Sequence, residues 1–220
     1  SRIIARAHRY DLYEEEHAGN YIPMRKGILD AIDYVYPCSE NGKDYILNAY
    51  PQYKNKVVPR FLGTIDCGVK AYTWGEAKIQ IVSCSNVVEV KRLDKLIGAL
   101  ALIKEIPIKW THYGDGVLMP AIKKQAAEKF GKNIEYEFKG NIDNSRLLKE
   151  YGRQNYYLFL NVSSSEGIPV SIMEAASFGI PCIATNVGGT GEIISDGDNG
   201  ILLSENPTEQ EIAEAIRALC

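Results

Sequence analysis

Residues 156–186 form the sequence YYLFLNVSSSEGIPVSIMEAASFGIPCIATN. The stretch opens and closes with short apolar runs, Tyr156–Val162 and Pro181–Asn186, which have the length and composition of β-strands. Between them, Val170–Phe178 has apolar residues at helical spacing and follows a proline, a residue well suited to a first helical turn. Strand, helix and strand in this order predict parallel strands joined by a right-handed crossover.

The same alternation extends over the chain from Lys78 onward. The other expected strands are Ile79–Ser85, Ile108–Gly114, Ile134–Gly140 and Gly200–Leu203. The other expected helices are Arg92–Lys104, Met119–Phe130, Ser145–Tyr151 and Thr208–Leu219. The predicted fold class is therefore α/β, a Rossmann-like, doubly wound parallel sheet of six strands with a partial second domain. Ligands of such sheets bind beyond the carboxyl ends of the strands.

The first part of the chain has a different pattern. The expected segments are an extended Ile3–His8, a polar Tyr13–Asn20, a helix or strand around Gly27–Tyr36, a helix Asn41–Tyr50 and an extended Lys56–Leu62. A composition shift and the turn-prone Gly63–Gly75 place a boundary near residues 55 to 77. We expect residues 1–55 to be the end of an amino-terminal domain and residues 56–220 to be a carboxy-terminal domain whose last helix is cut short. The chain is thus interpreted as a fragment of a longer protein.

Composition excludes several classes of protein. The 220 residues are 45% hydrophobic and 24% charged, and the net charge of −3 gives no reason to expect a nucleic-acid partner. The five cysteines are scattered, without metal-site spacing, which argues against a zinc site or a disulfide framework and favours a reducing, cytoplasmic setting. No apolar run approaches the roughly 20 residues that span a bilayer.

The loop before the Val170 helix is the strongest candidate for chemistry. Its Glu166 precedes the helix and Glu174 lies more than one turn inside it. The amide groups of Val170, Ser171 and Ile172 are expected to be free at the positive end of the helix dipole, an arrangement that suits phosphate. Two carboxylates bracketing a diphosphate fit a nucleotide sugar. From spacing alone, a plain structural interpretation, with Glu166 a solvated loop residue and Glu174 on an exposed helix face, is about as good as this functional one.

Residues 166–194, E-G-I-P-V-S-I-M-E-A-A-S-F-G-I-P-C-I-A-T-N-V-G-G-T-G-E-I-I, closely resemble the signature of glycosyltransferase family 4, retaining enzymes of the GT-B fold. The shared pattern is two glutamates separated by seven residues, a G-x-P at the next strand, a G-G loop and a downstream Glu. The resemblance continues upstream through I-V-S-C-S-N-V-V-E-V-K-R-L-D-K-L-I, W-T-H-Y-G-D-G and F-K-G-N-I, and covers roughly residues 56 to 219. It identifies the donor-binding, carboxy-terminal half of a GT-B protein.

The resemblance implies roles for individual residues. Glu166 would hold hydroxyls of the transferred sugar, Glu174 the ribose, and Lys91 the diphosphate, so that no divalent metal is needed. His8, in R-A-H-R-Y-D, matches a histidine that lies over the donor sugar, although a structural histidine is nearly as good an interpretation. The donor-binding residues implied are Asn86, Gly140, Gly167, Ile168, Val170, Ser171 and Glu174, and the catalytic ones are His8, Lys91 and Glu166. Ser39 fits the N-cap of the following helix.

Asn86 departs from the family pattern, because most members carry an arginine there that pairs with the lysine on the pyrophosphate. Either another cation replaces it, Arg92 being the nearest in sequence, or the donor site is weakened. The implied reaction is transfer of a sugar from a nucleoside-diphosphate sugar to an acceptor hydroxyl with retention. Such transfer commonly serves polysaccharide or glycolipid assembly on a sugar or lipid-linked acceptor at the inner face of the cell membrane, with peripheral membrane contact through the amino-terminal domain. One alternative is a non-catalytic module that binds nucleotide sugars or docks a partner. Another is an epimerase of the same fold that acts on a UDP-sugar. The fragment itself is expected to turn over no sugar.

Other features have plain structural explanations. Asp115, Asp196 and Asp198 alternate with glycines, which is turn chemistry before it is metal binding. The V-G-G-T-G loop matches no dinucleotide or ATP motif, so no cofactor is expected. Trp110 and His112 lie in an apolar run and are expected in the core.

Overall fold

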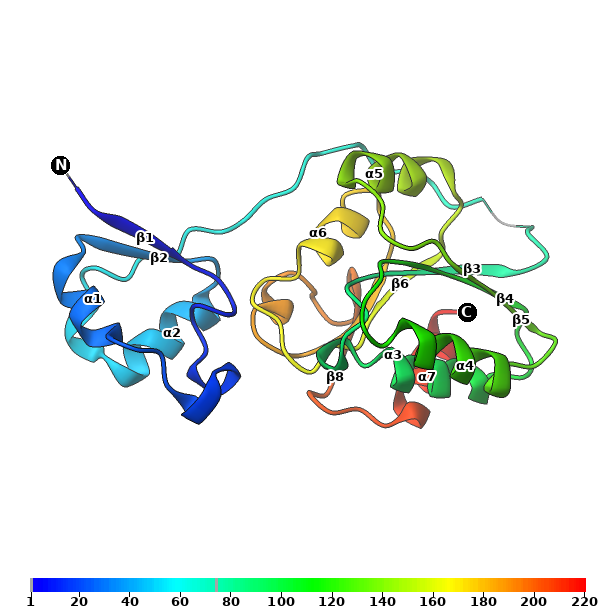
Figure 1. The fold of residues 1–220 in the computed structure, drawn as a ribbon. Coiled ribbons are helices and arrows are strands. Elements are labelled where there is room, and N and C mark those ends of the chain that lie inside the picture. The colour runs from blue at the N-terminus through cyan, green and yellow to red at the C-terminus, as the bar shows by residue number, and fades with distance from the viewer. Residues whose placement is uncertain (1, 74) are drawn as a thin grey trace.

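The computed structural model describes residues 2–73 and 75–220. Figure 1 shows two bodies, a small lobe (residues 2–57) and a large lobe (residues 78–220), joined by a long extended connector. The described part of the large lobe contains one six-stranded sheet in the order β5-β4-β3-β6-β7-β8, all of it parallel. Its strands are β3 (Ile79–Cys84), β4 (Ile108–Tyr113), β5 (Ile134–Phe138), β6 (Leu158–Asn161), β7 (Cys182–Thr185) and β8 (Gly200–Leu203). The prediction of a doubly wound α/β sheet is confirmed.

Helices cover both faces of this sheet (Figure 1). One face packs against α3 (Leu93–Leu102), α4 (Met119–Lys129) and α7 (Glu209–Leu219) through a core centred on Trp110 and Leu100. The other packs against α5 (Asn144–Arg153) and α6 (Val170–Ala176) through a core that includes Phe159. Central strands are buried on both sides, which explains why β6 and β7 are continuous apolar runs rather than alternating ones.

The small lobe pairs two parallel strands, β1 (Ile4–Ala7) and β2 (Tyr34–Pro37). Helices α1 (Arg25–Ala31) and α2 (Glu40–Ala49) accompany them, with 3-10 turns at Glu14–Glu16, Ala18–Asn20 and Pro51–Tyr53. A separate apolar cluster holds these elements together, with Leu12 and Val57 at its centre. The segment around Gly27–Tyr36, expected as helix or strand, contains most of α1 and the start of β2.

Some element boundaries differ from the expected ones. Helix α3 begins at Leu93 rather than Arg92, because Arg92 adopts a left-handed conformation (φ 48°) that no α-helix contains. The expected extended segment Lys56–Leu62 forms no named strand, and only Val57 bridges to Val35. Further along the connector, the Lys70 ammonium donates to the carbonyls of Arg153 (3.1 Å) and Gln154 (2.7 Å), at the carboxyl end of α5. This contact suits the negative end of the helix dipole.

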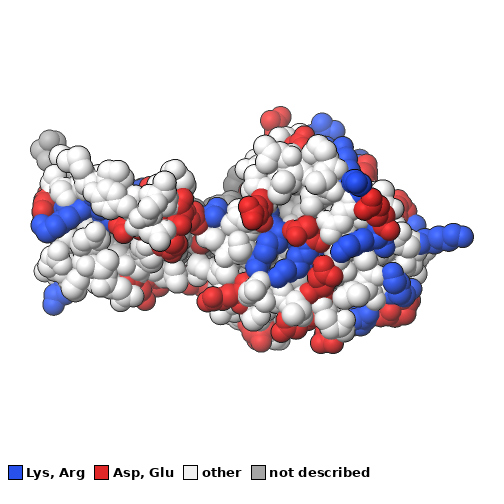
Figure 2. All heavy atoms as spheres, turned by 60° about the horizontal axis from the view of Figure 1, so that its bottom comes forward, with Lys and Arg blue, Asp and Glu red and all other residues white. Residues whose placement is uncertain are grey.

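Charge is mixed over the large lobe. Figure 2 shows Lys and Arg interspersed with Asp and Glu on the face in view. No helix in the described part of the chain is long and apolar enough to cross a membrane. Within residues 2–73 and 75–220, no group of three or more His, Cys, Asp or Glu side chains is placed to hold a metal ion.

Candidate functional site

The strand order reverses between β3 and β6: β4 and β5 follow β3 on one side of the sheet, and β7 and β8 follow β6 on the other. The strands β3 and β6 are hydrogen-bonded neighbours although they are far apart in the sequence. Loops leaving the carboxyl ends of two such strands diverge and open a crevice between them. A cavity of about 320 Å³ lies there. Its lining comes from the last residues of β3 and β4, the segments after β3, β4, β5 and β6, and the first turns of α5 and α6: Cys84, Ser85, Asn86, Lys91, Tyr113, Gly114, Asn141, Ile142, Leu147, Glu166, Ile168, Pro169, Val170 and Ser171.

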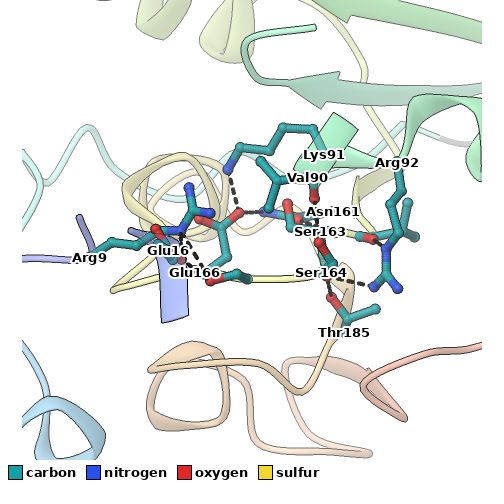
Figure 3. Close-up of polar contacts among 12 residues, drawn as sticks. Arg9, Glu16, Val90, Lys91, Arg92, Asn161, Ser163, Ser164, Glu166 and Thr185 are labelled. Atoms are coloured by element: carbon teal, nitrogen blue, oxygen red, sulfur yellow. Dashed lines mark hydrogen bonds and ion pairs between the residues drawn. The ribbon is translucent and has the colours of Figure 1, made fainter. Parts of the chain in front are cut away.

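Lys91 and Glu166 meet at the edge of this cavity. Lys91 ends the 3-10 turn η4 (Glu89–Lys91), and its ammonium lies 2.6 Å from Glu166 Oε1. Asn161, at the end of β6, donates to the same oxygen from Nδ2 (3.1 Å), as Figure 3 shows. The Glu166 side chain is only 8% exposed, so a cation and an amide hold a carboxylate that has lost most of its water.

Glu174 is as buried as Glu166 but is not among the residues that line the cavity. Its Oε1 accepts a hydrogen bond from Asn144 Nδ2 (2.6 Å), at the start of α5. The nearby Cys84 lines the cavity, and burial, followed by the charge of Glu174, raises the pKa of its thiol to about 11. Cys84 is therefore a neutral thiol near pH 7.

The start of α6 differs in one respect from the expectation. Pro169 is the N-cap residue, and its carbonyl accepts the Ile172 amide (3.0 Å). The expectation that Ile172 has a free amide is therefore wrong, because the first helical hydrogen bond uses it. Val170 and Ser171 both line the cavity.

Arg92 faces away from the cavity and does not replace the missing arginine at position 86. Its guanidinium donates to the carbonyls of Val162 (2.6 Å), Ser163 (2.7 Å) and Glu205 (3.0 Å) and to Asn206 Oδ1 (3.1 Å). These contacts brace β6 against the segment after β8. Asn86 itself is exposed and lines the cavity.

The small lobe reaches the loop between β6 and α6, residues 163–169, through Arg9 rather than His8. The His8 side chain is exposed at the end of β1, and its amide donates to Asp11 Oδ1 (2.8 Å). Arg9 Nε donates to Glu16 Oε1 (2.7 Å) and to Ser165 Oγ (3.1 Å), and Figure 3 shows its guanidinium on the side of Glu166. A second cavity, of about 370 Å³, lies between the lobes and has Glu166 in its wall.

Gly140, another of the predicted donor residues, holds two loops together. Its carbonyl accepts the Gly114 amide (2.9 Å), and both glycines have positive φ, 68° and 130°. Its neighbours Asn141 and Ile142, rather than Gly140 itself, line the cavity. Gly167 is buried, and Ile168 forms part of the cavity wall.

Residues 69–220 match the family model described as glycosyl transferases group 1. The chain belongs to this family. It is 26% identical over 211 residues to the GtfA subunit of the UDP-N-acetylglucosamine–peptide N-acetylglucosaminyltransferase of Streptococcus pneumoniae serotype 4, covering 90% of this chain and 40% of that protein. It is 31% identical over 155 residues to the N-acetyl-alpha-D-glucosaminyl L-malate synthase of Bacillus anthracis, covering 68% and 38%.

Solved structures show the same fold. TarM of S. aureus, crystallised as a variant with UDP and other ligands, superposes with a TM-score of 0.81 at 21% identity, over 99% of this chain and 43% of that one. Pneumococcal GtfA with UDP and GlcNAc gives 0.77 at 22% identity, over 100% and 45%. The large lobe thus has the Rossmann-like fold of the carboxy-terminal domain of GT-B glycosyltransferases. The chain spans about two fifths of the length of the curated relatives above.

Sequence patterns missed several residues that shape the site of this glycosyl transferase chain. Asn161 and Asn144 each hold one of the two glutamates, and Arg9 and Ser165 join the lobes. Asn161 could have been found from the sequence, because it is a polar residue next to the end of the apolar run Tyr156–Val162, and ligands bind at that end of the sheet. The others depend on contacts between segments distant in the sequence.

Below the cavity, a buried polar chain links neighbouring strands. Trp110 Nε1 donates to Ser83 Oγ (2.9 Å), and Ser83 Oγ lies 2.9 Å from His112 Nδ1. Burial lowers the pKa of His112 to about 4, so the imidazole is neutral at pH 7. Trp110 and His112 are fully buried, as expected from the sequence.

Proposed function

We propose that the protein containing this chain transfers a sugar from a nucleoside-diphosphate sugar to an acceptor hydroxyl, with retention at the anomeric carbon, as glycosyltransferases of family 4 do. The observation that carries the proposal is the cavity at the β3–β6 crevice, where Lys91, Glu166 and the start of α6 come together. A diphosphate fits this combination of a cation with helix amides, and sugar hydroxyls fit the carboxylate.

Each residue has a role in this reaction. Negative charge grows on the departing diphosphate, and a cation fixed beside it lowers the barrier, because the largest electrostatic gain lies where charge develops. We assign this role to Lys91, whose side chain lines the cavity together with Glu166 and the start of α6. Glu166 would exchange its bond with Lys91 for hydroxyls of the sugar, while Asn161 keeps the carboxylate oriented. Glu174, held by Asn144, would accept hydrogen bonds from the ribose.

The donor and acceptor classes are part of the proposal. Several relatives carry UDP-N-acetylglucosamine in their names, which makes UDP-linked N-acetylhexosamines the first donors to test. The second cavity, between the lobes and next to Glu166, has room for an acceptor. We expect a sugar or lipid-linked acceptor, as in polysaccharide or glycolipid assembly at the inner membrane face. The two curated relatives named above are named as enzymes, one a transferase and one a synthase, which supports an enzyme over a non-catalytic binding module.

Calorimetry tests the donor site directly. The chain should bind UDP, or failing that GDP or ADP, at millimolar concentration or below, and should turn over no sugar by itself. Absence of binding by all three nucleotides would remove the proposal. In the full-length protein, transfer should survive EDTA, since Lys91 and the α6 amides supply the positive charge, and the product's anomeric proton should show retention by NMR. Activity lost in EDTA and restored by Mn²⁺ would contradict this assignment.

A further inference from the structure

The amino end of α2 in the small lobe is capped by a side chain of the large lobe. Glu192 ends the 3-10 turn η5 (Thr190–Glu192) and accepts the Glu40 amide at Oε2 (2.9 Å) and the Asn41 amide at Oε1 (2.8 Å). Within the small lobe, Ser39 Oγ accepts the Gly42 amide (2.9 Å). The first amides of a helix have no partner inside it, and here two lobes satisfy three of them together.

The turn that carries Glu192 also supports the loop of residues 163–169. The Gly189 amide donates to the Gly167 carbonyl (2.7 Å). A Cβ at Gly188 would lie 1.8 Å from the Glu166 carbonyl oxygen, and one at Gly189 would lie 3.1 Å from Ser39 Cβ. The two glycines therefore form a thin layer, with the loop of residues 163–169 on one side and the cap of α2 on the other.

The same loop touches the small lobe at a second place. Ser165 Oγ donates to Glu16 Oε1 (2.6 Å), and Arg9 Nε donates to Ser165 Oγ (3.1 Å). A Cβ at Gly167 would lie 3.1 Å from Arg9 Cβ. The loop that carries Glu166 is thus in contact with the small lobe at Ser165 and Gly167, and through the Gly188–Gly189 layer as well.

We propose that Glu192 is a positioning residue: its carboxylate latches the small lobe to the turn behind the Glu166 loop and so holds Glu166 in place for transfer. Hydrogen bonds from amides to a carboxylate are stronger than neutral ones, and the α2 dipole favours the negative charge. The Glu192 side chain is exposed, so water competes for it and the latch can open between turnovers. The catalytic part of this inference rests on the proposed function.

Amide hydrogen exchange, followed by NMR on this chain without ligand, tests the latch itself. Glu192→Ala should speed exchange at the Glu40 and Asn41 amides about tenfold or more, and Glu192→Gln, whose single oxygen can still accept, should give a smaller change. Glu214→Ala is the matched control, because Glu214 is an exposed glutamate that accepts a hydrogen bond from Gln210 on its own helix. Unchanged exchange at both amides in Glu192→Ala would overturn the proposal.

Kinetics of the longer protein test positioning against simple stabilisation of α2. Glu192→Ala should lower kcat about tenfold while the Kd for UDP stays within about twofold, since the residue acts on the loop and not on the nucleotide. Ser39→Ala removes only the cap within the lobe, and it should speed exchange at Gly42 while kcat stays within about twofold. Equal losses of kcat in the two variants, or none in Glu192→Ala, would refute a positioning role. No binding of UDP by the parent chain would refute the proposed function instead, and the exchange experiment would still decide whether Glu192 joins the lobes.

Discussion

Replacing Lys91 by alanine should cost both stability and nucleotide affinity, and a second substitution separates the two effects. At 2.6 Å the Lys91–Glu166 attraction amounts to about 6 kcal/mol for an effective dielectric constant of about 20, before desolvation of the two ions is subtracted. Removing one partner leaves a buried carboxylate with the Asn161 amide alone. Buried pairs broken in this way typically lose about 3 to 5 kcal/mol; because Asn161 remains and Lys91 is 19% exposed, we expect roughly 2 to 4 kcal/mol.

The double variant Lys91→Ala/Glu166→Gln removes the unpaired charge. Urea denaturation should therefore show that it recovers most of the stability lost by Lys91→Ala, because a neutral amide at position 166 needs no cation. Calorimetry should show that it does not recover affinity for UDP, which falls roughly ten- to a hundredfold in both variants. Lys91→Ala with stability within about 0.5 kcal/mol of the parent would mean that the pair does not hold Glu166 in solution. Regained UDP affinity in the double variant would mean that Lys91 does not bind the diphosphate.

Three further predictions concern single positions. Glu174→Ala should weaken UDP binding roughly ten- to a hundredfold. Glu166→Ala should leave UDP binding nearly unchanged and remove the extra affinity contributed by the sugar. Calorimetry with UDP and UDP-sugar checks this, and equal behaviour of the two variants would contradict it. Asn86→Arg should tighten UDP binding, with a gain that shrinks at high salt because the new contact is ionic; weaker binding would show that position 86 does not face the diphosphate. His112 has a lowered folded-state pKa of about 4, so its contribution to stability is fully present above about pH 6.5 and is lost as pH falls through 4. Urea denaturation should show a loss on the order of 3 kcal/mol that is absent from His112→Phe. Equal slopes of unfolding free energy against pH for parent and variant would argue against a buried neutral imidazole.

Local patterns were sufficient for the sheet. Apolar runs bounded by turn residues, alternating with helical segments, predict parallel strands because helical crossovers cover both faces of the central strands. The N-cap at Ser39 was predictable for the same reason, since the bond to the Gly42 amide spans three residues. The left-handed conformation of Arg92 was not predictable, and neither were the four hydrogen bonds that its side chain makes with distant segments.

The site was predictable only in part, because its key contacts join residues far apart in the chain. Lys91 and Glu166 are separated by 75 positions, and Asn41 and Glu192 by 151. A sequence motif can indicate that each residue matters, but pairing across such distances depends on how the strands are ordered in the sheet. The expectation of a free amide at Ile172 was wrong for a local reason. The residue at which a helix makes its first hydrogen bond is set by the geometry of the preceding loop.

The contact between Gly188 and the Glu166 carbonyl also predicts how the chain will tolerate mutation. Gly188 and Gly197 both have positive φ, 54° and 78°, but no heavy atom lies within 4 Å of a Cβ placed at Gly197. In a saturation library sorted for nucleotide binding, codon 188 should return glycine alone. Codon 197 should also return asparagine and aspartate, which adopt the left-handed conformation at a cost of about 1 kcal/mol. Directed evolution of donor specificity will therefore have to leave Gly188 and Gly189 unchanged, because variants at these positions will be lost in the first round of selection.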